Sequence, residues 1–429
     1  MSKTRHDYEL MDAADKLRPL KKQFVLPPGV IYLDGNSLGA MPAATAERTR
    51  QVVEDEWGVG LIRSWNDAGW IEQPHRIGDK IARLIGAGKG EVIVADSTSL
   101  NLYKVLSAAL EQVKAQAGNS SRRTIVSERE NFPTDLYIAQ SLAKQHGFTL
   151  KLIDSPDELP AVMDQHLAVL MLTQVNYRSG RVHDMQALTA QAHAAGALTV
   201  WDLCHSAGAI PVDLLAANAD FAIGCGYKYL NGGPGSPAFV WVNPRHADKC
   251  WQPLSGWLGH EAPFAFTTDY QPAAGIKRYI CGTPGIIAMA ALECGVDTLL
   301  AAEPMGGMAA LRQKSLDLSN AFITLVDERL AAEFGVRIAS PRDPALRGSQ
   351  VSLALSEEMN GEAYATVQAL IGRGVIGDYR AGAPNLLRFG FTPLYLGFAE
   401  VWDAVEHLVQ VLRGKEYLQP RFQKQGAVT

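Results

Sequence analysis

The sequence has few cysteines and no paired cysteine motif. Five cysteines stand far apart among 429 residues, and no Cys-x-x-Cys occurs. The sequence therefore predicts neither a disulfide framework nor a metal site of the zinc-knuckle kind. We expect reduced, mostly buried thiols at Cys204, Cys225, Cys250, Cys281 and Cys294.

Long apolar runs and an excess of positive charge are missing too. No run approaches the roughly 18–20 apolar residues of a transmembrane helix, and residues 1–22 lack the apolar segment of a secretion signal. The 40 Lys and Arg against 45 Asp and Glu give a net charge of −5, whereas proteins that bind nucleic acid usually carry the opposite sign. We therefore expect a cytosolic protein without membrane or nucleic-acid partners.

The chain nevertheless has the composition of a folded globular protein, with 47% hydrophobic and 20% charged residues. Apolar segments alternate with amphipathic ones. We expect strands at 124–126, 149–153, 168–173, 198–202, 221–224 and 238–242, and helices at 43–57, 75–85, 100–116, 134–145 and 185–194. Strands that are apolar throughout and separated by helices predict an α/β fold, with a mostly parallel sheet covered on both faces.

The pattern changes after about residue 284. Two long helices are predicted at 286–300 and 308–330, followed by strands near 336–339, 351–354, 375–376 and 386–389 and helices at 361–371 and 399–412. Length alone suggests about three domains. The pattern instead predicts an N-terminal arm (1–42) packed with the small domain, a large domain (43–285), and a linker helix with a smaller α+β domain (286–429).

One motif suggests a different chemistry. Gly35-Asn36-Ser37-Leu38-Gly39 fits the G-x-S-x-G nucleophile elbow of hydrolases. An elbow serine normally follows a central strand, but only one helix and one strand are predicted before Ser37. We therefore interpret this motif as a turn with glycines at positive φ.

Four other segments together match the needs of pyridoxal phosphate (PLP), whose aldehyde takes an amine and whose pyridine nitrogen takes a carboxylate. A buried strand ends at Asp202 with His205 three residues on, and the next strand leads to Tyr227-Lys228 before a glycine-rich turn. Hydroxyls at Ser97 and Thr98 open a helix and can bind phosphate. The fourth segment, residues 131–135, offers an aromatic ring and a second carboxylate. Each residue alone has an ordinary structural explanation, but the combination is specific.

Over nearly its whole length the chain resembles the fold-type-I PLP enzymes of the aminotransferase class V group, and specifically the kynureninases. The resemblance is carried by residues 33–39, 131–137, 201–208, 227–235, 253–257, 278–283 and 388–395. It implies a seven-stranded type of sheet in the large domain and a homodimer with shared active sites. It also implies PLP-dependent hydrolytic Cβ–Cγ cleavage of L-kynurenine to anthranilate and L-alanine.

The resemblance also implies a role for each site residue. Lys228 would form the Schiff base and move the Cα proton, Asp202 with Asp135 would hold the pyridine nitrogen, and Tyr227 would act as general acid. The cofactor would further contact Ser97, Thr98, Phe132, Thr173, His205, Tyr227, Trp257 and Thr283, the last from the neighbouring subunit. Substrate would contact Ser37, Trp65, Gly282, Thr283 and Arg388, with Arg388 clamping the α-carboxylate.

Some alternatives remain open at this point. Trp65, Gly282 and Thr283 are similar to the bacterial set that favours kynurenine over 3-hydroxykynurenine, but Trp65 could equally be a core residue. Arg388 could be only an ion-pair partner. A cysteine desulfurase, an aminotransferase or a non-catalytic PLP-binding regulator are the competing functions. A desulfurase needs a cysteine in a mobile loop and a regulator needs a basic DNA-binding extension, and the sequence indicates neither.

Overall fold

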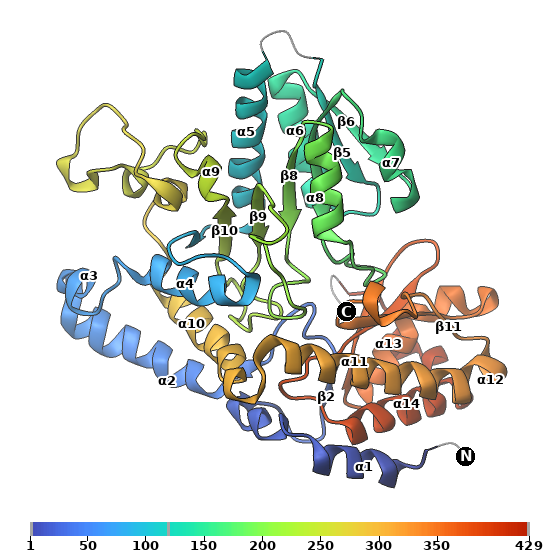
Figure 1. Ribbon diagram of the computed structural model, residues 1–429. Coiled ribbons are helices and arrows are strands. Elements are labelled where there is room, and N and C mark those ends of the chain that lie inside the picture. Colours follow the sequence, from blue (N-terminus) through green and yellow to red (C-terminus); the bar gives the residue numbers. More distant parts are fainter. Residues whose placement is uncertain (1–2, 118–120, 427–429) are drawn as a thin grey trace.

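In the computed structural model, residues 3–117 and 121–426 are described, and they divide into a large sheet-based part and a smaller part beside it (Figure 1). Within those residues seven strands form the large sheet, listed here in spatial order: β4 (Val92–Ala95), β10 (Ala238–Val242), β9 (Phe221–Gly224), β8 (Leu198–Asp202), β7 (Leu167–Thr173), β5 (Thr124–Glu128) and β6 (Thr149–Ile153). β10 runs antiparallel to both neighbours, and the pairs from β9 to β6 are parallel. The predicted α/β fold with a mostly parallel sheet is confirmed.

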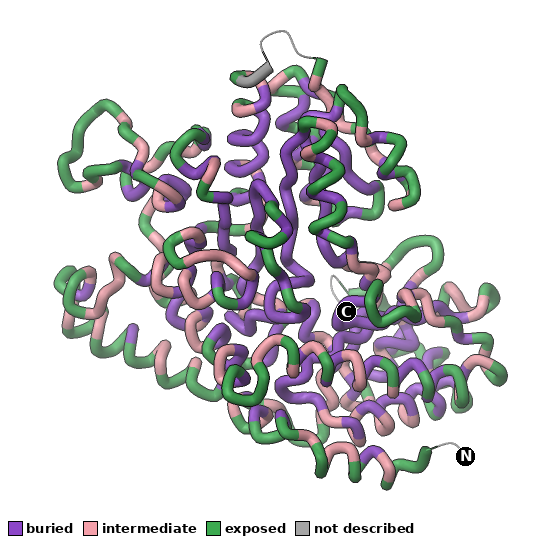
Figure 2. The backbone as a smooth tube through the Cα atoms, viewed as in Figure 1, coloured by how far each residue is buried: buried purple, intermediate pink, exposed green. Residues whose placement is uncertain are grey.

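Helices cover both faces of this sheet. They are α4 (Gln73–Ile85), α5 (Thr98–Ala117), α6 (Pro133–His146), α8 (Met185–Ala194) and α10 (Ile286–Leu300), and α2 (Ala43–Gln51) packs on the outside of α10. The strand side chains alternate between two hydrophobic clusters. In β8, Val200 faces the cluster of α5 and α6, whereas Trp201 faces the cluster of α4, α8 and α10. Figure 2 shows the buried strands running through the middle of this part.

Most predicted elements have the expected positions. β6, β8, β9, β10, α8 and α10 begin and end where the sequence predicted. The helix predicted at 43–57 is α2 continued by a π-helix, Val52–Gly60. β4 was missed, although its four residues are all buried.

The smaller part is built on a second sheet, in which β11 (Arg337–Ile338), β12 (Gln350–Ala354), β15 (Leu386–Gly390) and β14 (Asp378–Arg380) are neighbours in that order. It packs with α11 (Gly307–Val326), α13 (Ala363–Gly372) and α14 (Phe398–Arg413). The sequence did not predict β14. Its Asp378 pairs with two arginines of the site described below.

The N-terminal segment lies against this smaller part. β2 (Ile31–Tyr32) pairs in parallel with β13 (Val375–Ile376), and α1 (Arg5–Ala14) packs along α14. The Asp12 carboxylate accepts hydrogen bonds from the first backbone N–H groups of α14, at 2.6 Å from Phe398 N. A carboxylate at a helix N-terminus satisfies unpaired donors and complements the helix dipole, so Asp12 helps to anchor the segment.

Residues 35–39 form a turn, as the sequence indicated, but the prediction of glycines at positive φ is wrong, because neither Gly35 nor Gly39 has a positive φ. The close approach of neighbouring atoms requires the glycine instead. The Gly39 N–H donates to the carbonyl oxygen of Tyr227 at 2.8 Å, and a Cβ at Gly39 would lie 2.4 Å from the Lys228 carbonyl oxygen. Only glycine permits this approach. The turn therefore packs directly against the segment that carries Lys228.

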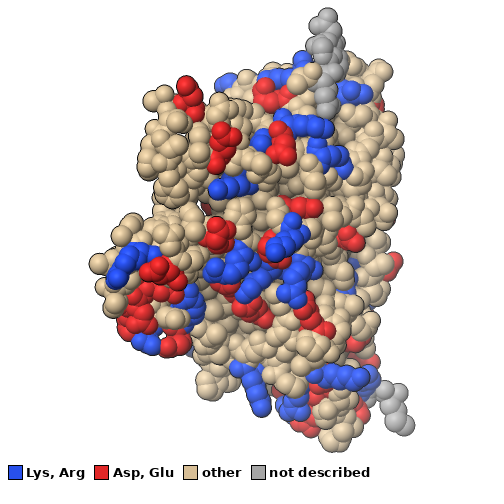
Figure 3. Space-filling view, turned by 60° about the vertical axis from the view of Figure 1, so that its left-hand side comes forward, with Lys and Arg blue, Asp and Glu red and all other residues tan. Residues whose placement is uncertain are grey.

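The surface carries both signs of charge. On the face shown in Figure 3, Lys and Arg are interspersed with Asp and Glu, and ion pairs such as Arg76–Glu293 (2.9 Å) join them. In the described part of the chain, no helix is both long enough and apolar enough to span a bilayer.

Candidate active site

A cavity of about 90 Å³ lies where the carboxyl ends of β7, β8 and β9 meet at one edge of the large sheet. Loops that follow parallel strands converge at that edge, which is the usual ligand site of such sheets. The predicted residues that line the cavity are Thr98, Phe132, Asp135, Thr173, Asp202, His205, Tyr227 and Lys228. Residues from distant parts of the sequence thus meet as the sequence indicated.

The Lys228 amine is the basic group of this cavity. Its Nζ lies 2.9 Å from His205 Nε2 and about 6 Å from the Phe132 ring centre. His205 is buried, and its Nδ1 lies 3.1 Å from Gln350 Oε1. Burial and the nearby Lys228 charge hold the pKa of His205 well below its usual range. The imidazole is therefore neutral at neutral pH, so that its Nε2 can accept a hydrogen bond from the amine.

Two buried carboxyls form the acidic side. Asp202 ends β8, and its Oδ1 accepts a hydrogen bond from Cys204 N at 2.6 Å. Burial and the adjacent Asp202 carboxylate raise the pKa of Asp135 well above its usual range, and the two side chains hydrogen-bond to each other. The pair therefore shares a proton. Among the described residues, nothing donates to or accepts from Asp135 Oδ2, although it is buried.

Phe132 presents an aromatic face to the cavity. The ring is 43% exposed and packs edge-on against Tyr177, with centroids 5.4 Å apart. Asn131 holds this segment, because its Oδ1 accepts from Phe132 N at 2.6 Å and from the Thr173 hydroxyl. On the other side of the cavity, α5 begins at Thr98, and Ser97 Oγ accepts from Leu100 N at 3.4 Å.

These residues fit PLP. The cavity places an amine, a carboxyl pair, an exposed aromatic face and a helix N-terminus around one space. They match, in turn, the aldehyde, the pyridine nitrogen, the ring and the phosphate of the cofactor. The buried Asp135 oxygen without a partner also points to a ligand, because such atoms are rare in folded proteins.

Four predicted residues lie away from this cavity. Trp257 and Thr283 are exposed, and Gly282 and Thr283 line a second cavity of about 210 Å³. Trp65 is half-buried and packs edge-on against Trp70, with centroids 5.9 Å apart. Within this one chain, the described residues therefore do not bring these side chains to Lys228.

A wider opening of about 530 Å³ adjoins the cofactor cavity and shares Phe132 and Tyr177 with it. We call it the vestibule. It is lined by Asp34, Ser37, Phe132, Pro133, Tyr177, Tyr364, Tyr379, Arg380, Ala381, Gln425 and Gly426. Ser37, which the resemblance implies as a substrate contact, is therefore one of the residues that line the vestibule.

The predicted residue Arg388 lies behind this opening, fully buried. Its guanidinium donates to Asp378 (Nε to Oδ1, 2.9 Å), to Ser37 Oγ (2.8 Å) and to the Tyr177 carbonyl oxygen (2.5 Å). Arg380 shares Asp378 with it and also donates to Ser37 Oγ, at 3.1 Å. Ser37 therefore occupies a donor of Arg388 that a carboxylate oxygen could take.

Sequence reasoning missed several residues of the site. Tyr177 follows β7 in a polar turn, and the convergence of strand ends could have indicated it. Gln350, which orients His205, and Asp378, which holds Arg388, lie in the smaller part and contact the site across 145 and 10 residues, respectively. Neither carries a local sequence signal, because Gln350 reaches His205 only when the two parts dock and Asp378 meets Arg388 only when β14 pairs with β15.

The Cys204 thiol, which lines the cavity, is poorly suited to act as a nucleophile. Cys204 and Cys225 are buried side by side. The hydrogen bond with Cys225 and burial raise the pKa of Cys204 well above its usual range. Thiolate is the reactive form, so Cys204 does not offer the chemistry that a desulfurase requires.

Comparisons with known proteins agree with this site. A family model described as "Kynureninase C-terminal domain" matches residues 311–408. The chain is 56% identical to a protein named kynureninase from Pseudomonas fluorescens, over 99% of this chain and 100% of that one. It is 53% identical to a kynureninase from Burkholderia pseudomallei (strain K96243), over 100% of both chains.

Solved structures with a similar fold are more distant in sequence. A cysteine desulfurase from Thermococcus onnurineus NA1 superposes with a TM-score of 0.75 at 21% identity, over 92% of this chain and 98% of that one. A cysteine desulfurase from Escherichia coli gives 0.74 at 19% identity, over 93% and 98%. At this identity the likeness establishes the fold, and the full-length relatives establish the family. The chain belongs to the kynureninases, PLP-dependent hydrolases that act on carbon–carbon bonds.

Proposed function

We propose that this chain cleaves L-kynurenine with water into anthranilate and L-alanine, using PLP held by Lys228. The observation that carries the proposal is the single cavity in which the Lys228 amine faces the Asp202–Asp135 pair and the Phe132 ring. Bound PLP supplies an electron sink for the breaking bond. The roles below belong to the protein's own residues.

Asp202 would hold the pyridine nitrogen in its protonated form. Because Asp135 keeps a proton, the pair carries one negative charge, which matches one positive ring nitrogen. Phe132 would stack on the ring, and neutral His205 would orient Lys228. Thr173, tied to Asn131, would border the ring on its polar side.

The phosphate would bind at the start of α5, with Ser97, Thr98, Tyr227 and Trp257 contributing. Thr283 would come from the neighbouring subunit of a homodimer. Supporting this arrangement, Thr283 and Gly282 are accessible and lie outside the chain's own cofactor cavity. A dimer of this kind brings two incomplete sites together.

Arg388 would bind the substrate α-carboxylate. Ser37 Oγ occupies one of its donors at 2.8 Å and donates to Asp378 Oδ2 at 2.6 Å. Rotation of the Ser37 side chain about its Cα–Cβ bond would give up this hydrogen bond, so that a carboxylate oxygen can replace Ser37 Oγ while Arg388 keeps its pair with Asp378. Ser37 would then donate to the bound carboxylate.

Proton transfer would involve two neighbouring residues. The Lys228 amine, once released by substrate, can carry the Cα proton, and His205 can hold it in place. Burial and the Cys225 and Cys204 thiols raise the pKa of Tyr227. The phenol is therefore protonated at neutral pH and available as general acid for the Cβ carbon, which takes a proton when anthranilate departs and so becomes the methyl group of alanine.

The test is Tyr227→Phe in the holoenzyme. We expect retained PLP and a loss of turnover of about 10²- to 10⁴-fold, the usual size of a general-acid contribution. Anthranilate fluorescence after adding L-kynurenine measures the turnover of the parent enzyme and of the variant. Unchanged kcat in the variant would remove Tyr227 from the mechanism, and absence of anthranilate with the parent enzyme would remove the proposed reaction.

Specificity for kynurenine over 3-hydroxykynurenine would come from Trp65, Gly282 and Thr283. A higher kcat/KM for 3-hydroxykynurenine would overturn this preference. We further propose a cytoplasmic location and the division into an arm (1–42), a large domain (43–285) and a small domain with its linker helix (286–429). The anchoring of α1 on α14 and of β2 on β13 supports the grouping of the arm with the small domain.

A further inference from the structure

Lys104 is a lysine whose side chain is completely buried. It lies on α5, six residues beyond Thr98. Its ammonium donates to the Asp96 carboxylate, to Asn101 Oδ1 at 3.3 Å and to the Tyr279 carbonyl oxygen at 2.7 Å. Three donors thus meet three acceptors. Burying an ammonium is unfavourable unless each of its hydrogens is paired, so these contacts constrain all three partners.

The first partner sets the start of α5. Asp96 joins β4 to α5 with a φ of +46°, which side-chain-bearing residues rarely adopt. Its carbonyl oxygen accepts from Ala238 N at 2.9 Å, and its carboxylate is held by Lys104. This strained residue precedes Ser97 and Thr98 directly, so its conformation determines where the helix N-terminus points.

The other contacts reach two further segments. Tyr279 is fully buried and leads through Cys281 to Thr283. The Cys281 thiol interacts with both Lys104 and Asp96. A Cβ at Gly256 would lie 1.5 Å from the Cys281 carbonyl oxygen, so the backbone before Trp257 rests on the same segment. Asp96, Gly282 and Thr283 also line one cavity.

We propose that Lys104 is the positioning residue for the cofactor phosphate. It ties together the three segments that carry the proposed phosphate contacts Thr98, Trp257 and Thr283. The inference rests on the proposed function, because those contacts belong to it. Since Thr283 would serve the neighbouring subunit, one ammonium positions groups for both active sites of the dimer.

A purely structural lysine would behave differently, and the chain supplies a matched control. Lys314 on α11 is 7% exposed, pairs with Asp15 at 2.7 Å and donates to the Pro393 carbonyl oxygen at 2.7 Å. It thus has similar burial and similar partners, but Asp15 and Pro393 belong to none of the three segments that carry the proposed phosphate contacts. Losing it affects folding without touching the phosphate segments.

The experiment compares Lys104→Met and Lys314→Met with the parent, each as the full chain. The apoenzymes are titrated with PLP and with pyridoxal, which lacks the phosphate, and thermal unfolding is recorded for each. We expect Lys104→Met to weaken PLP by about 10- to 100-fold, the size typical of residues that orient a ligand's direct contacts. Pyridoxal affinity should stay unchanged, and Lys314→Met should leave both affinities unchanged.

Three results would overturn the proposal: unchanged PLP affinity in Lys104→Met, an equal loss for PLP and pyridoxal, or the same loss in Lys314→Met. If Lys104→Met does not fold, Asp96→Asn serves instead, because asparagine tolerates positive φ but removes the carboxylate charge. It should show the same difference between PLP and pyridoxal, and equal affinities to the parent would overturn the proposal. Anthranilate release by the parent enzyme tests the proposed function separately.

Discussion

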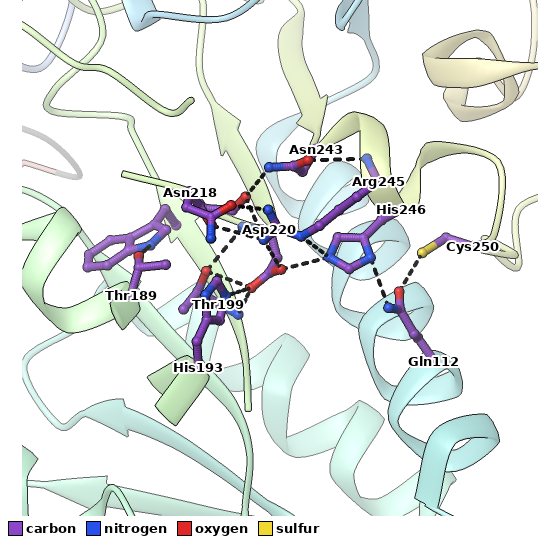
Figure 4. A network of polar contacts seen from close by, with 12 residues as sticks. Gln112, Thr189, His193, Thr199, Asn218, Asp220, Asn243, Arg245, His246 and Cys250 are labelled. Atoms are coloured by element: carbon purple, nitrogen blue, oxygen red, sulfur yellow. Dashed lines mark hydrogen bonds and ion pairs between the residues drawn. The ribbon is translucent and has the colours of Figure 1, made fainter. Parts of the chain in front are cut away.

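Two buried aspartates lie at opposite ends of neighbouring strands, and their surroundings differ. Asp202 ends β8 at the cofactor cavity, whereas Asp220 directly precedes β9 at the other edge of the sheet. Figure 4 shows the network around Asp220. Its carboxylate accepts from His193 and His246 (2.8 and 2.7 Å), Arg245 (2.5 Å) and the Thr199 backbone N–H (2.8 Å).

The difference lies in how completely each carboxyl is paired. Burial alone would raise the pKa of Asp220, but the hydrogen bonds from His193, His246 and Arg245 lower it below its usual range. At the other edge, Asp135 beside Asp202 has a raised pKa and an oxygen without a partner among the described residues. A saturated carboxylate holds the fold together, whereas an incompletely paired one marks where a ligand binds.

The largest effect is expected from Lys228→Ala. Turnover should fall by more than about 1,000-fold, as when other covalent catalytic residues are removed. The fold should be retained, because Lys228 is half-buried and, among the described residues, its side chain hydrogen-bonds only with His205. Anthranilate fluorescence and thermal unfolding measure the two properties. Near-normal turnover would refute the assignment of Lys228.

Asp220→Asn should lower stability and leave turnover nearly unchanged, the opposite of Lys228→Ala. It leaves Arg245 without its buried counter-charge, which costs about 3–5 kcal/mol in comparable pairs. Denaturant unfolding measures the loss, while kcat of the folded holoenzyme should stay close to the parent value. A stable but inactive variant would contradict the comparison.

The difference in stability between the parent and Asp220→Asn should also depend on pH. Because the folded-state pKa of Asp220 is lowered, its stabilisation is present above the unfolded value of about 3.9 and is lost as pH falls further. The deficit of Asp220→Asn relative to the parent should therefore be constant above about pH 5 and shrink below about pH 4. A deficit that grows on acidification would show the sign to be wrong.

Asp135→Asn should be milder. The folded-state pKa of Asp135 is raised, so the parent apoenzyme loses stability relative to its unfolded chain as pH rises above about 4. Asparagine does not ionise, so the variant does not lose stability in this way as pH rises. The variant apoenzyme should equal or exceed the parent in unfolding free energy at pH 8, while holoenzyme turnover falls by about 10- to 100-fold. Urea titrations at pH 4.5 and 8 test this, and lower stability at pH 8 would contradict it.

The smallest effects are expected when the two histidines that contact Asp220 are replaced one at a time. His193 is 27% exposed, whereas His246 is 8% exposed and also faces Gln112, at 2.9 Å. Replacing His193 by glutamine should cost about 1 kcal/mol, as for one hydrogen bond. His246→Gln should cost more, because its neighbours are buried. Equal losses of stability in the two variants would mean that burial does not determine how much each histidine contributes.

The strands of the large sheet were predictable because buried parallel strands are apolar along their whole length. β7 is buried at every residue, and its limits differ by one residue from the prediction. β4 and β14 were not predicted, and length alone does not explain this, because β9 also has four residues and was predicted. Asp202, His205 and Lys228 were predictable because polar residues at strand ends are costly without a purpose.

The sequence alone determined the cofactor chemistry and the family, because an amine, a carboxylate and a helix start at fixed spacing are needed together. Only the tertiary structure decided which charges are satisfied. It pairs Arg388 with Asp378, Lys104 with Asp96 and Asp220 with two histidines, and it leaves one oxygen of Asp135 free. The physical reason is that these partners, 8 to 27 residues apart and on different elements, meet only when strands, helices and loops pack together, which no local pattern records.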